Sequence, residues 1–502
     1  MAKQKFLKHR IIRRLIQFFF LILFIILFYQ TRYGVDGELP NLFFKFDPLI
    51  FIITSIAYRA IIAATLFSII LIISSLVFGR FFCGFICPLG TTIDIFDALI
   101  DNKNKRGIVP KNIKYLMLLV LVIAAILGVS LLHFFDPLVI LERSLTLILY
   151  PIATYFLGFF TNLTNVSYTE KLITLVVFIV IMGLGFVTPR FWCRNVCALG
   201  GVYAVLAKFA LWKFSFLDDC KKCGICTAVC PTGAIDFEAK KIDSGECIDC
   251  LRCQYECPTR TISYKLNFKF LPFDIKRREF IMATAAGLIL APLAKSVLHQ
   301  KVDGRLIRPP GSIPESDFLN VCIHCGKCMK VCLTNGLQPC IFESGINGLW
   351  TPRLVPRIGG CEKNCNMCGQ VCPTSAIRKL GLEEKSYVRM GTAVIDRSRC
   401  LAWEQDKLCL ICDEACPYNA ISSRAETIHG VKLLRPFIEE KICTGCGLCE
   451  ALCPIEGLSA IQVFSMGEER KASGTYITEE KKRLRQDAGK FEDIPSGFIL
   501  EE

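Results

Sequence analysis

The sequence predicts a multi-domain protein: an all-α membrane helical bundle, with four spans in two repeats plus a fifth anchor, that carries small α+β domains rich in cysteine. Three observations predict this class. Hydrophobic residues make up 53% of the 502 residues and the mean hydropathy is +0.45, which is too apolar for a soluble protein and too polar for one wholly within a bilayer. Apolar stretches gather before residue 213. Most of the 29 cysteines follow residue 219 in regular runs.

These patterns divide the chain into five parts. We expect a transmembrane domain at 1–213, a first cysteine-rich domain at 214–265, a basic and then apolar segment at 276–298, a second cysteine-rich domain at 299–465 and a tail at 466–502.

Four apolar stretches are predicted to span the membrane: Leu15–Tyr29, Ile61–Phe78, Tyr115–Leu132 and Leu172–Val187. Six Lys or Arg residues in Met1–Arg14, and five more in the loop 101–114, place the amino terminus and that loop in the cytoplasm. A further stretch, Ser144–Phe160, is interrupted by Pro151, and we interpret it as interfacial or re-entrant.

The cysteines between 220 and 257 fall in two runs with the spacing C-x2-C-x2-C-x3-C-P. This spacing is typical of bacterial ferredoxins with two [4Fe–4S] clusters, in which the fourth cysteine of each run ligates the other cluster. A disulfide framework and structural zinc are the alternatives. The expected ligands are Cys220, Cys223, Cys226 and Cys257 for one cluster, and Cys247, Cys250, Cys253 and Cys230 for the other.

Four more runs predict four more [4Fe–4S] clusters, six in all, with zinc as the alternative. Two of these runs have a widened first gap, and the linkers between consecutive runs are all nearly 30 residues long. Which run supplies the fourth ligand to which cluster is therefore open. Cys340 is left over as a packed thiol or a thiol beside a cluster. The runs are Cys322, Cys325, Cys328 and Cys332; Cys361, Cys365, Cys368 and Cys372; Cys400, Cys409, Cys412 and Cys416; and Cys443, Cys446, Cys449 and Cys453.

An internal repeat supports the four-span arrangement. Residues 79–90, GRFFCGFICPLG, match residues 189–200, PRFWCRNVCALG, at a constant offset of 110 residues, and FDP at 46–48 matches FDP at 135–137. Equivalent segments of two repeated helix pairs should lie on the same side of the membrane. The two C-x3-C turns are therefore expected to face one another at the cytoplasmic ends of the second and fourth spans.

This convergence makes Cys83, Cys87, Cys193 and Cys197 candidates for one further iron–sulfur site. The alternatives are four buried thiols, a disulfide within each turn, or zinc. Positive charge at Arg80, Arg190 and Arg194 would lower the pKa of these thiols and favour the thiolate, which is the form that binds metal.

The segment that begins Lys276-Arg277-Arg278 and continues into the apolar stretch Ile281–Leu293 has the shape of a twin-arginine export signal. Such a signal would carry a domain with assembled clusters across the membrane already folded. The alternatives are an interfacial helix and an ordinary linker. Because the segment is internal, we expect it to remain as a fifth span.

Other classes of function are disfavoured. The net charge of +14 lies largely beside apolar segments, where it orients helices and meets anionic lipid, so no nucleic acid is expected. The chain has no C-x-x-C-H motif and only five histidines, which disfavours haem, and no flavin-binding domain precedes the bundle.

With these motifs in place, residues 1–265 resemble NapH, a membrane quinol dehydrogenase component with paired C-x3-C motifs and a two-cluster ferredoxin. Ala198 departs from the proline that this family has after its second pair. Residues 276–460 resemble NapG and MauM, which are twin-arginine-exported proteins with four [4Fe–4S] clusters. The chain thus resembles a NapH–NapG fusion and, more distantly, the NosR-like proteins.

The resemblance implies oxidation of menaquinol or ubiquinol and delivery of electrons toward a periplasmic reductase. The implied partners are membrane lipid, the quinol pool, and redox proteins such as a periplasmic reductase or cytochrome and other subunits of a respiratory complex. The implied location is the bacterial inner membrane, with residues 214–265 cytoplasmic and 301–502 periplasmic. The alternative is an electron-wire subunit that is fed by a cytoplasmic donor and binds no quinone.

If quinol is oxidised here, its protons should leave near the outer end of the repeat. Asp47, His133 and Asp136 lie beside apolar segments there, and ionisable groups at a membrane boundary are functional candidates. The alternative is that each Asp-Pro pair simply caps the helix that follows it.

Overall fold

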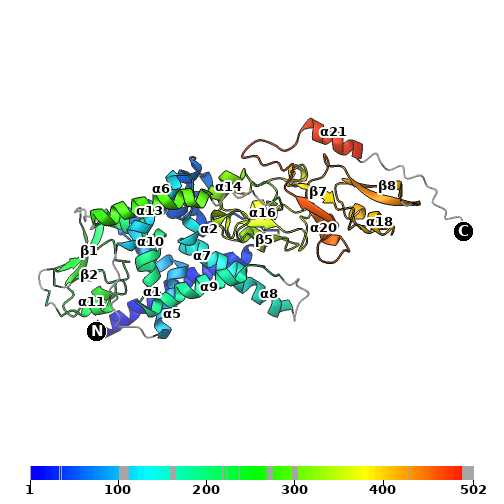
Figure 1. The fold of residues 1–502 in the computed structure, drawn as a ribbon. Coiled ribbons are helices and arrows are strands. Elements are labelled where there is room, and N and C mark those ends of the chain that lie inside the picture. The colour runs from blue at the N-terminus through cyan, green and yellow to red at the C-terminus, as the bar shows by residue number, and fades with distance from the viewer. Residues whose placement is uncertain are drawn as a thin grey trace.

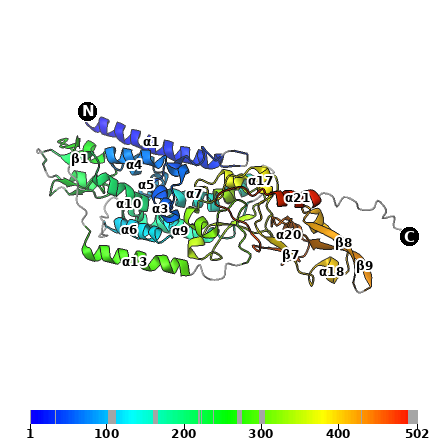
Figure 2. The ribbon, with the colours of Figure 1, turned by 90° about the horizontal axis from the view of Figure 1, so that it is seen from above.

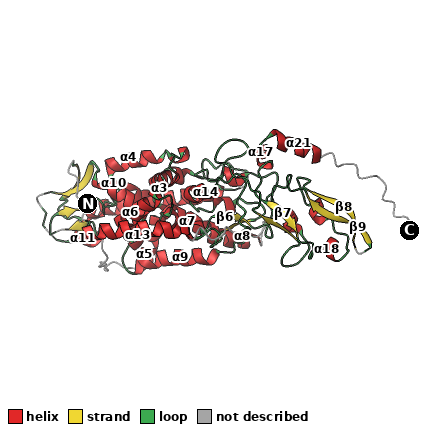
Figure 3. Ribbon diagram, turned by 45° about the horizontal axis from the view of Figure 1, so that its top comes forward, coloured by secondary structure: helices red, strands yellow, loops and turns green. Residues whose placement is uncertain are grey.

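The computed structural model describes residues 2–32, 34–35, 37–100, 112–158, 166–217, 220–221, 223–236, 238–267, 275–296, 304–428 and 430–488. The molecule is elongated, with a helical bundle between two smaller domains that lie at opposite ends (Figure 1). The strands lie to either side of the helical middle (Figure 3).

Two long helices run along opposite sides of the bundle (Figure 2). Helix α1 (Ala2–Gln30) has 29 residues, or about 44 Å at 1.5 Å per residue. Helix α13 (Arg277–Ser296) packs along α6 (Ile113–Ile126) through small side chains, so that a Cβ added at Gly287 would lie 2.9 Å from Ile123. The basic and apolar segment predicted at 276–298 is therefore a helix fitted closely against the bundle as far as Ser296.

The two repeats build the rest of the bundle, with α2 (Leu42–Lys45) before them. The first repeat consists of α3 (Pro48–Tyr58), the 3-10 turn η1 (Ala63–Thr65), α4 (Ser68–Phe78), the π-turn η2 (Phe82–Ile86) and α5 (Pro88–Ile100). The second consists of the 3-10 turn η3 (Leu132–Phe134), α7 (Pro137–Ser144), the π-turn η4 (Leu145–Leu149), α8 (Tyr150–Gly158), α9 (Lys171–Gly183), the 3-10 turn η5 (Leu184–Phe186), the π-turn η6 (Trp192–Val196) and α10 (Ala198–Lys208).

Two helices among the described residues, Ile11–Gln30 and Pro137–Gly158, are long and apolar enough to cross a membrane. The other three predicted spans correspond to shorter apolar helices, so the four-span arrangement is not confirmed. One reason is local: Gly128 adopts φ 74 just after the end of α6, a left-handed conformation that stops the helix. The fifth span, predicted at Ile281–Leu293, does not reach the same length and hydropathy.

Pro151 does not interrupt the stretch Ser144–Phe160 as its sequence suggests, because the run Pro137–Gly158 is helical throughout. A proline lacks an N–H and clashes with the carbonyl four residues earlier in a regular helix. Here the π-turn Leu145–Leu149 precedes it and widens the backbone at that point. As far as Gly158, the apolar stretch therefore belongs to a continuous helical run of 22 residues.

The first small domain follows α10 directly. Strands β1 (Trp212–Phe216) and β4 (Ile262–Leu266) pair antiparallel, as do β2 (Ile235–Asp236) and β3 (Lys241–Ile242). Helices α11 (Ile225–Val229) and α12 (Arg252–Glu256) each begin between the second and third cysteine of a run. This is a compact α+β unit with its own small core.

The second small domain contains three two-stranded antiparallel sheets and several short helices. Its sheets pair β5 (Leu337–Pro339) with β6 (Pro352–Leu354), β7 (Thr392–Ile395) with β10 (Ile461–Phe464), and β8 (Ile421–Ile428) with β9 (Val431–Ile438). Its helices are α14 (Glu315–Val321), α15 (Lys327–Lys330), α16 (Met367–Gln370), α17 (Leu382–Ser386), α18 (Leu401–Glu404), α19 (Ile411–Glu414), α20 (Leu448–Leu452) and α21 (Glu479–Ala488).

The segment after residue 465 is not a separate tail as far as Ala488. Tyr476 is fully buried and Arg470 forms an ion pair with Glu315, so this segment packs on the domain before it. The cores of the second domain and the bundle are also continuous: Ile323 and Cys325 pack into the bundle core, while Leu147 and Tyr168 pack into the core of the second domain.

Candidate iron–sulfur centres

The two C-x3-C turns have the same backbone structure. In each, a π-turn leads to a cysteine with φ near −60° and ψ near 110°, at the start of α5 or α10. The Cys87 thiol accepts a hydrogen bond from the N–H of Gly90 at 3.4 Å, and the Cys197 thiol accepts one from Gly200 at 3.2 Å. The internal repeat read from the sequence is therefore present in the fold.

The four thiols of these turns converge, as the repeat predicts. Cys83, Cys87, Cys193 and Cys197, here called the bundle thiols, are close enough for their charges to act on one another. All 29 cysteines are free thiols, so the structure contains no disulfide within either turn. This proximity agrees with the expected facing of the two turns, and a cluster on these four thiols stays a prediction.

Buried cations surround the bundle thiols. The Arg80 guanidinium hydrogen-bonds to Cys83, and Arg190 donates to the Cys83 carbonyl at 3.2 Å. Both side chains are at most 2% exposed. Arg194 lies elsewhere, since its guanidinium is near Gly233 of the first small domain. Two of the three predicted arginines thus serve the thiols.

The carboxylates of Asp47 and Asp136 lie in the bundle interior, close enough for their charges to act on one another. Each caps its helix: Asp47 accepts the N–H of Leu49 at 2.8 Å, and Asp136 accepts that of Leu138 at 2.8 Å. They are 1% and 0% exposed, so both are buried inside the protein, and their expected role at the outer end of the repeat stays a prediction. The alternative role, helix capping, is confirmed. Tyr203 lies between this pair and the bundle thiols, close enough for both to act on it.

The first small domain docks on the same end of the bundle as the C-x3-C turns. A Cβ at Gly84 would lie 2.1 Å from the carbonyl of Ile248, so only glycine permits this approach of the loop that carries Cys247. Arg80 Nη1 donates to the Gly245 carbonyl at 2.6 Å. Lys114, which we expect in a cytoplasmic loop, lies at the start of α6 and is fully buried in an ion pair with Glu246 at 2.6 Å.

In the first small domain, the crossed thiol sets expected from the spacing come together. One pocket is lined by Cys220, Cys223, Cys226 and Cys257. The charges of Cys230 and Cys250 act on Cys253, which places the second crossed set together as well. Burial alone would raise the pKa of Cys257. Hydrogen bonds from Thr261 and Thr259 nevertheless lower this pKa to about 7, which favours the thiolate.

The second small domain resolves the pairing that the linkers leave open. The first and second runs exchange their fourth thiols, so that each completes the set of the other. The third and fourth runs exchange theirs in the same way. The four sets are Cys322, Cys325, Cys328 and Cys372; Cys361, Cys365, Cys368 and Cys332; Cys400, Cys409, Cys412 and Cys453; and Cys443, Cys446, Cys449 and Cys416.

These thiols fit clusters better than single ions. Burial raises the pKa of Cys325, Cys412 and Cys446 to about 12, so these thiols would ionise only beside the positive charge of bound iron. Three of the sets line cavities. Nowhere in the described ranges do three His, Cys, Asp or Glu side chains close around one point as a single metal ion requires.

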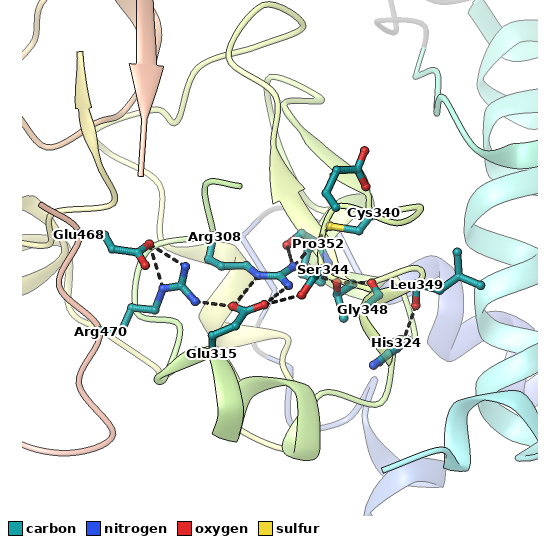
Figure 4. Close-up of polar contacts among 12 residues, drawn as sticks. Arg308, Glu315, His324, Cys340, Ser344, Gly348, Leu349, Pro352, Glu468 and Arg470 are labelled. Atoms are coloured by element: carbon teal, nitrogen blue, oxygen red, sulfur yellow. Dashed lines mark hydrogen bonds and ion pairs between the residues drawn. The ribbon is translucent and has the colours of Figure 1, made fainter. Parts of the chain in front are cut away.

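Cys340, the thiol outside every set, belongs to a polar network around Arg308 (Figure 4). Arg308 Nη1 donates to Thr351 at 2.9 Å and to the Pro352 carbonyl at 2.8 Å, and it lies 3.5 Å from the Cys340 sulfur. Its other nitrogens bind Glu315. Cys340 is fully buried there, so the interpretation as a packed thiol holds.

Sequence reasoning missed the junction between the bundle and the second small domain. His133 of η3 stacks on His324, with ring centroids 3.8 Å apart and planes at 17°. The Arg143 guanidinium lies 3.7 Å from the ring centroid of Trp350. His133 is 0% exposed and lies where the bundle meets the second small domain, and its expected role at the outer end of the repeat stays a prediction. The available signal was His324 itself, the one histidine inside a cysteine run.

Two lysines of α15 complete this junction. Lys327 Nζ lies 3.6 Å from Glu142 Oε1 and donates to the carbonyl of Pro40 and the side chain of Asn41. Lys330 Nζ donates to the Phe28 carbonyl and lies over the Phe28 ring at 3.4 Å. Both lysines are in the run that begins at Cys322, so the loop that would hold a cluster is itself the docking surface.

Comparison with known proteins agrees with this arrangement. The family described as a 4Fe-4S binding domain matches residues 60–107 and 171–216, one match in each repeat. Families described as 4Fe-4S dicluster domains match residues 219–261 and 407–457 and residues 246–337. The last match joins two runs that the structure keeps in different domains, because all regular runs share the same spacing.

The fold and the thiol sets define an iron–sulfur electron-transfer protein of the ferredoxin type, with several [4Fe–4S] domains. The MauM ferredoxin-type protein of methylamine utilisation from Paracoccus denitrificans is 36% identical over 191 residues, which are 36% of this chain and 81% of that protein. The ferredoxin-type protein NapG of Escherichia coli is 34% identical over 193 residues, 36% of this chain and 82% of that protein. This chain belongs to the MauM and NapG family of ferredoxin-type proteins.

Proposed function

We propose that the protein is the membrane-bound quinol dehydrogenase component of a respiratory system, a fusion of NapH-like and NapG-like parts that passes electrons from quinol toward a periplasmic acceptor. One observation carries the proposal: two domains of cluster-binding thiols sit at opposite ends of an apolar bundle that holds four converging thiols of its own. A freely diffusing ferredoxin has no need of such a bundle.

In this proposal the chain binds seven clusters. Six are [4Fe–4S] cubanes on the crossed thiol sets of the two small domains, and the seventh lies on the bundle thiols. When bound, such clusters accept and give up single electrons at potentials set by charge, hydrogen bonds and burial. The chain supplies the buried arginines Arg80 and Arg190, which offset the negative charge of a thiolate-ligated cluster.

Charge and shape support the membrane position of this proposal. Basic residues at the start of α1 keep that end in the cytoplasm, together with the first small domain beside it. The second small domain, residues 304–488, lies at the far end of the bundle and is therefore periplasmic, carried there by a twin-arginine-like segment that becomes α13. Its partners are the quinol pool, membrane lipid and a periplasmic reductase or cytochrome.

Quinol oxidation also releases protons, and the bundle offers acceptors for them. The facing carboxylates of Asp47 and Asp136 are buried between the bundle thiols and His133. A buried pair of carboxylates holds one proton readily because two like charges cannot both be accommodated. We assign these three residues to proton transfer beside their capping and packing roles.

The test is reduction of the purified protein by a short-chain menaquinol under anaerobic conditions, followed by electron paramagnetic resonance of the clusters. Reduction of the clusters at a rate that depends on quinol concentration supports the proposal, with dithionite reduction as the control for intact clusters. The competing function is a wire fed by a cytoplasmic donor without quinone. Clusters that dithionite reduces and quinol does not would establish that alternative.

A further inference from the structure

The two halves of the bundle differ at several matched positions, and two of these bear on the contact between the bundle and the second small domain. His133 in the second half corresponds to Phe44 in the first, and Ala198 corresponds to Pro88. Elsewhere the repeat keeps its Phe-Asp-Pro turns and its cysteines. These two differences therefore change the contacts that the second half of the bundle makes.

The first difference supplies a hydrogen bond that proline cannot make. The N–H of Ala198, the residue after Cys197, donates to the carbonyl of Phe135 at 3.4 Å. Pro88 has no N–H, so the first half lacks this link. Through it, the backbone beside one bundle thiol joins the backbone two residues from His133.

The second difference supplies a ring contact with the other domain. His133 stacks on His324 at 3.8 Å, and neither nitrogen of His133 has a hydrogen-bond partner among the described residues. Stacking is thus what holds this ring. His324 lies between Cys322 and Cys325, and its backbone N–H donates to the Cys322 thiol.

We propose that the Ala198–Phe135 hydrogen bond and the His133–His324 stack form the electron path between the bundle thiols and the thiol set of Cys322, Cys325, Cys328 and Cys372. Electron tunnelling is faster through bonded and closely packed atoms than across gaps, and this path contains one hydrogen bond and one ring contact. One electron passes at a time: the donor site is oxidised by one, the acceptor site is reduced by one, and no proton is needed. The inference rests on the proposed function only in that both thiol sets hold clusters; it does not require quinol.

The experiment injects electrons at the cytoplasmic end. A ruthenium photosensitiser is attached to a cysteine introduced as Glu238→Cys, an exposed position on the first small domain. Flash excitation with a sacrificial donor then reduces that domain, and the arrival of electrons in the second small domain is followed by absorbance and by freeze-quenched paramagnetic resonance. This readout works whether or not quinol is a substrate.

Two pairs of variants decide the outcome. His133→Ala removes the ring contact, and His133→Phe keeps an aromatic ring there, as the first half does at Phe44. Ala198→Pro removes the N–H at the first position of α10, where proline is tolerated, and Ala198→Gly keeps it. We expect the alanine and proline variants to slow electron arrival several-fold and their partners to match the parent protein.

Structural readouts separate a broken path from a broken protein. Iron content, the paramagnetic resonance spectra at equilibrium and the midpoint potentials should be unchanged in all four variants. Hydrogen exchange of the Ala198 amide should be slow in the parent and in both His133 variants. Equal arrival rates in His133→Ala, Ala198→Pro and the parent would overturn the proposal, even if quinol reduces the protein. Slow arrival in His133→Phe to the same extent as His133→Ala would also overturn it.

Discussion

Replacing Asp94 by Asn should loosen the two turns that present Cys83 and Cys193. The Asp94 carboxylate of α5 accepts hydrogen bonds from Nε and Nη2 of Arg190, both at 2.6 Å, and from Nη2 of Arg13 at 3.0 Å. Burial alone would raise the pKa of Asp94, but Arg190 and Arg13 hold it well below its usual value. The carboxylate is therefore ionised, and it holds two guanidinium groups that are 1% and 4% exposed.

The magnitude follows from what the amide leaves behind. Removing one partner of a buried ion pair costs about 3–5 kcal/mol, because the remaining charge stays buried without compensation. Asp94 keeps 18% of its exposure, so solvent screens part of this loss and we expect about 3 kcal/mol. In hydrogen exchange, the segments 80–86 and 190–196 should then open about 100-fold more often.

The matched control is Asp97→Asn, one turn further along the same helix. Asp97 accepts the backbone N–H of Arg190 at 2.8 Å, a bond that an asparagine oxygen can also accept, so exchange should change by less than about threefold. Both variants should keep the iron of the two small domains. If Asp94→Asn exchanges no faster than Asp97→Asn, the buried arginines do not depend on this carboxylate and the reasoning fails.

Three further changes probe other parts of the molecule. Glu246→Gln leaves its buried lysine partner in α6 unpaired, so the first small domain should become susceptible to limited proteolysis, with a local cost of about 3 kcal/mol. Arg308→Lys cannot reproduce the guanidinium fork and should lower the melting temperature of the second small domain, whereas Cys340→Ala should cost only about 1 kcal/mol and leave the iron content unchanged. Gly287→Val should separate α13 from α6 and lower the local stability, measured by hydrogen exchange, by about 1–3 kcal/mol. Ala285→Val, on the exposed face of α13, should leave this stability unchanged.

The cysteine sets show which part of a site is legible in sequence. Three of the four thiols of each set lie within one short run, so spacing alone predicts that they share a site. The fourth comes from another run, and between Cys332 and Cys361 or Cys372 and Cys400 the linkers are too alike to discriminate. Packing decides the partner, and only the structure contains it.

In the bundle, by contrast, the sequence predicts a contact between distant segments but not the burial of individual residues. Sequence repetition predicts the convergence of two distant turns correctly, because equal sequences adopt equal local structure. Depth and burial are not local properties, so the sequence does not predict that Asp47, Asp136 and Lys114 are buried, whereas it does predict the two helix caps as one alternative. The stacking of His133 on His324 joins residues with no shared pattern, and no periodicity could have predicted it.

The junction also bears on why the two parts belong to one chain. Lys327 reaches both halves of the bundle, since its ammonium meets Glu142 of the second repeat and the Pro40 carbonyl before the first. Separation of the second small domain would leave Glu142, 1% exposed, without its cation, a loss that costs about 3–5 kcal/mol when the group stays buried. It would also uncover Ile323 and Cys325, which pack in the bundle core. A domain held in this way stays bound to the bundle and does not move between separate docking positions. Under the proposed function, we therefore expect a redox partner to approach the far face, where Cys400, Cys409, Cys412 and Cys453 line their cavity.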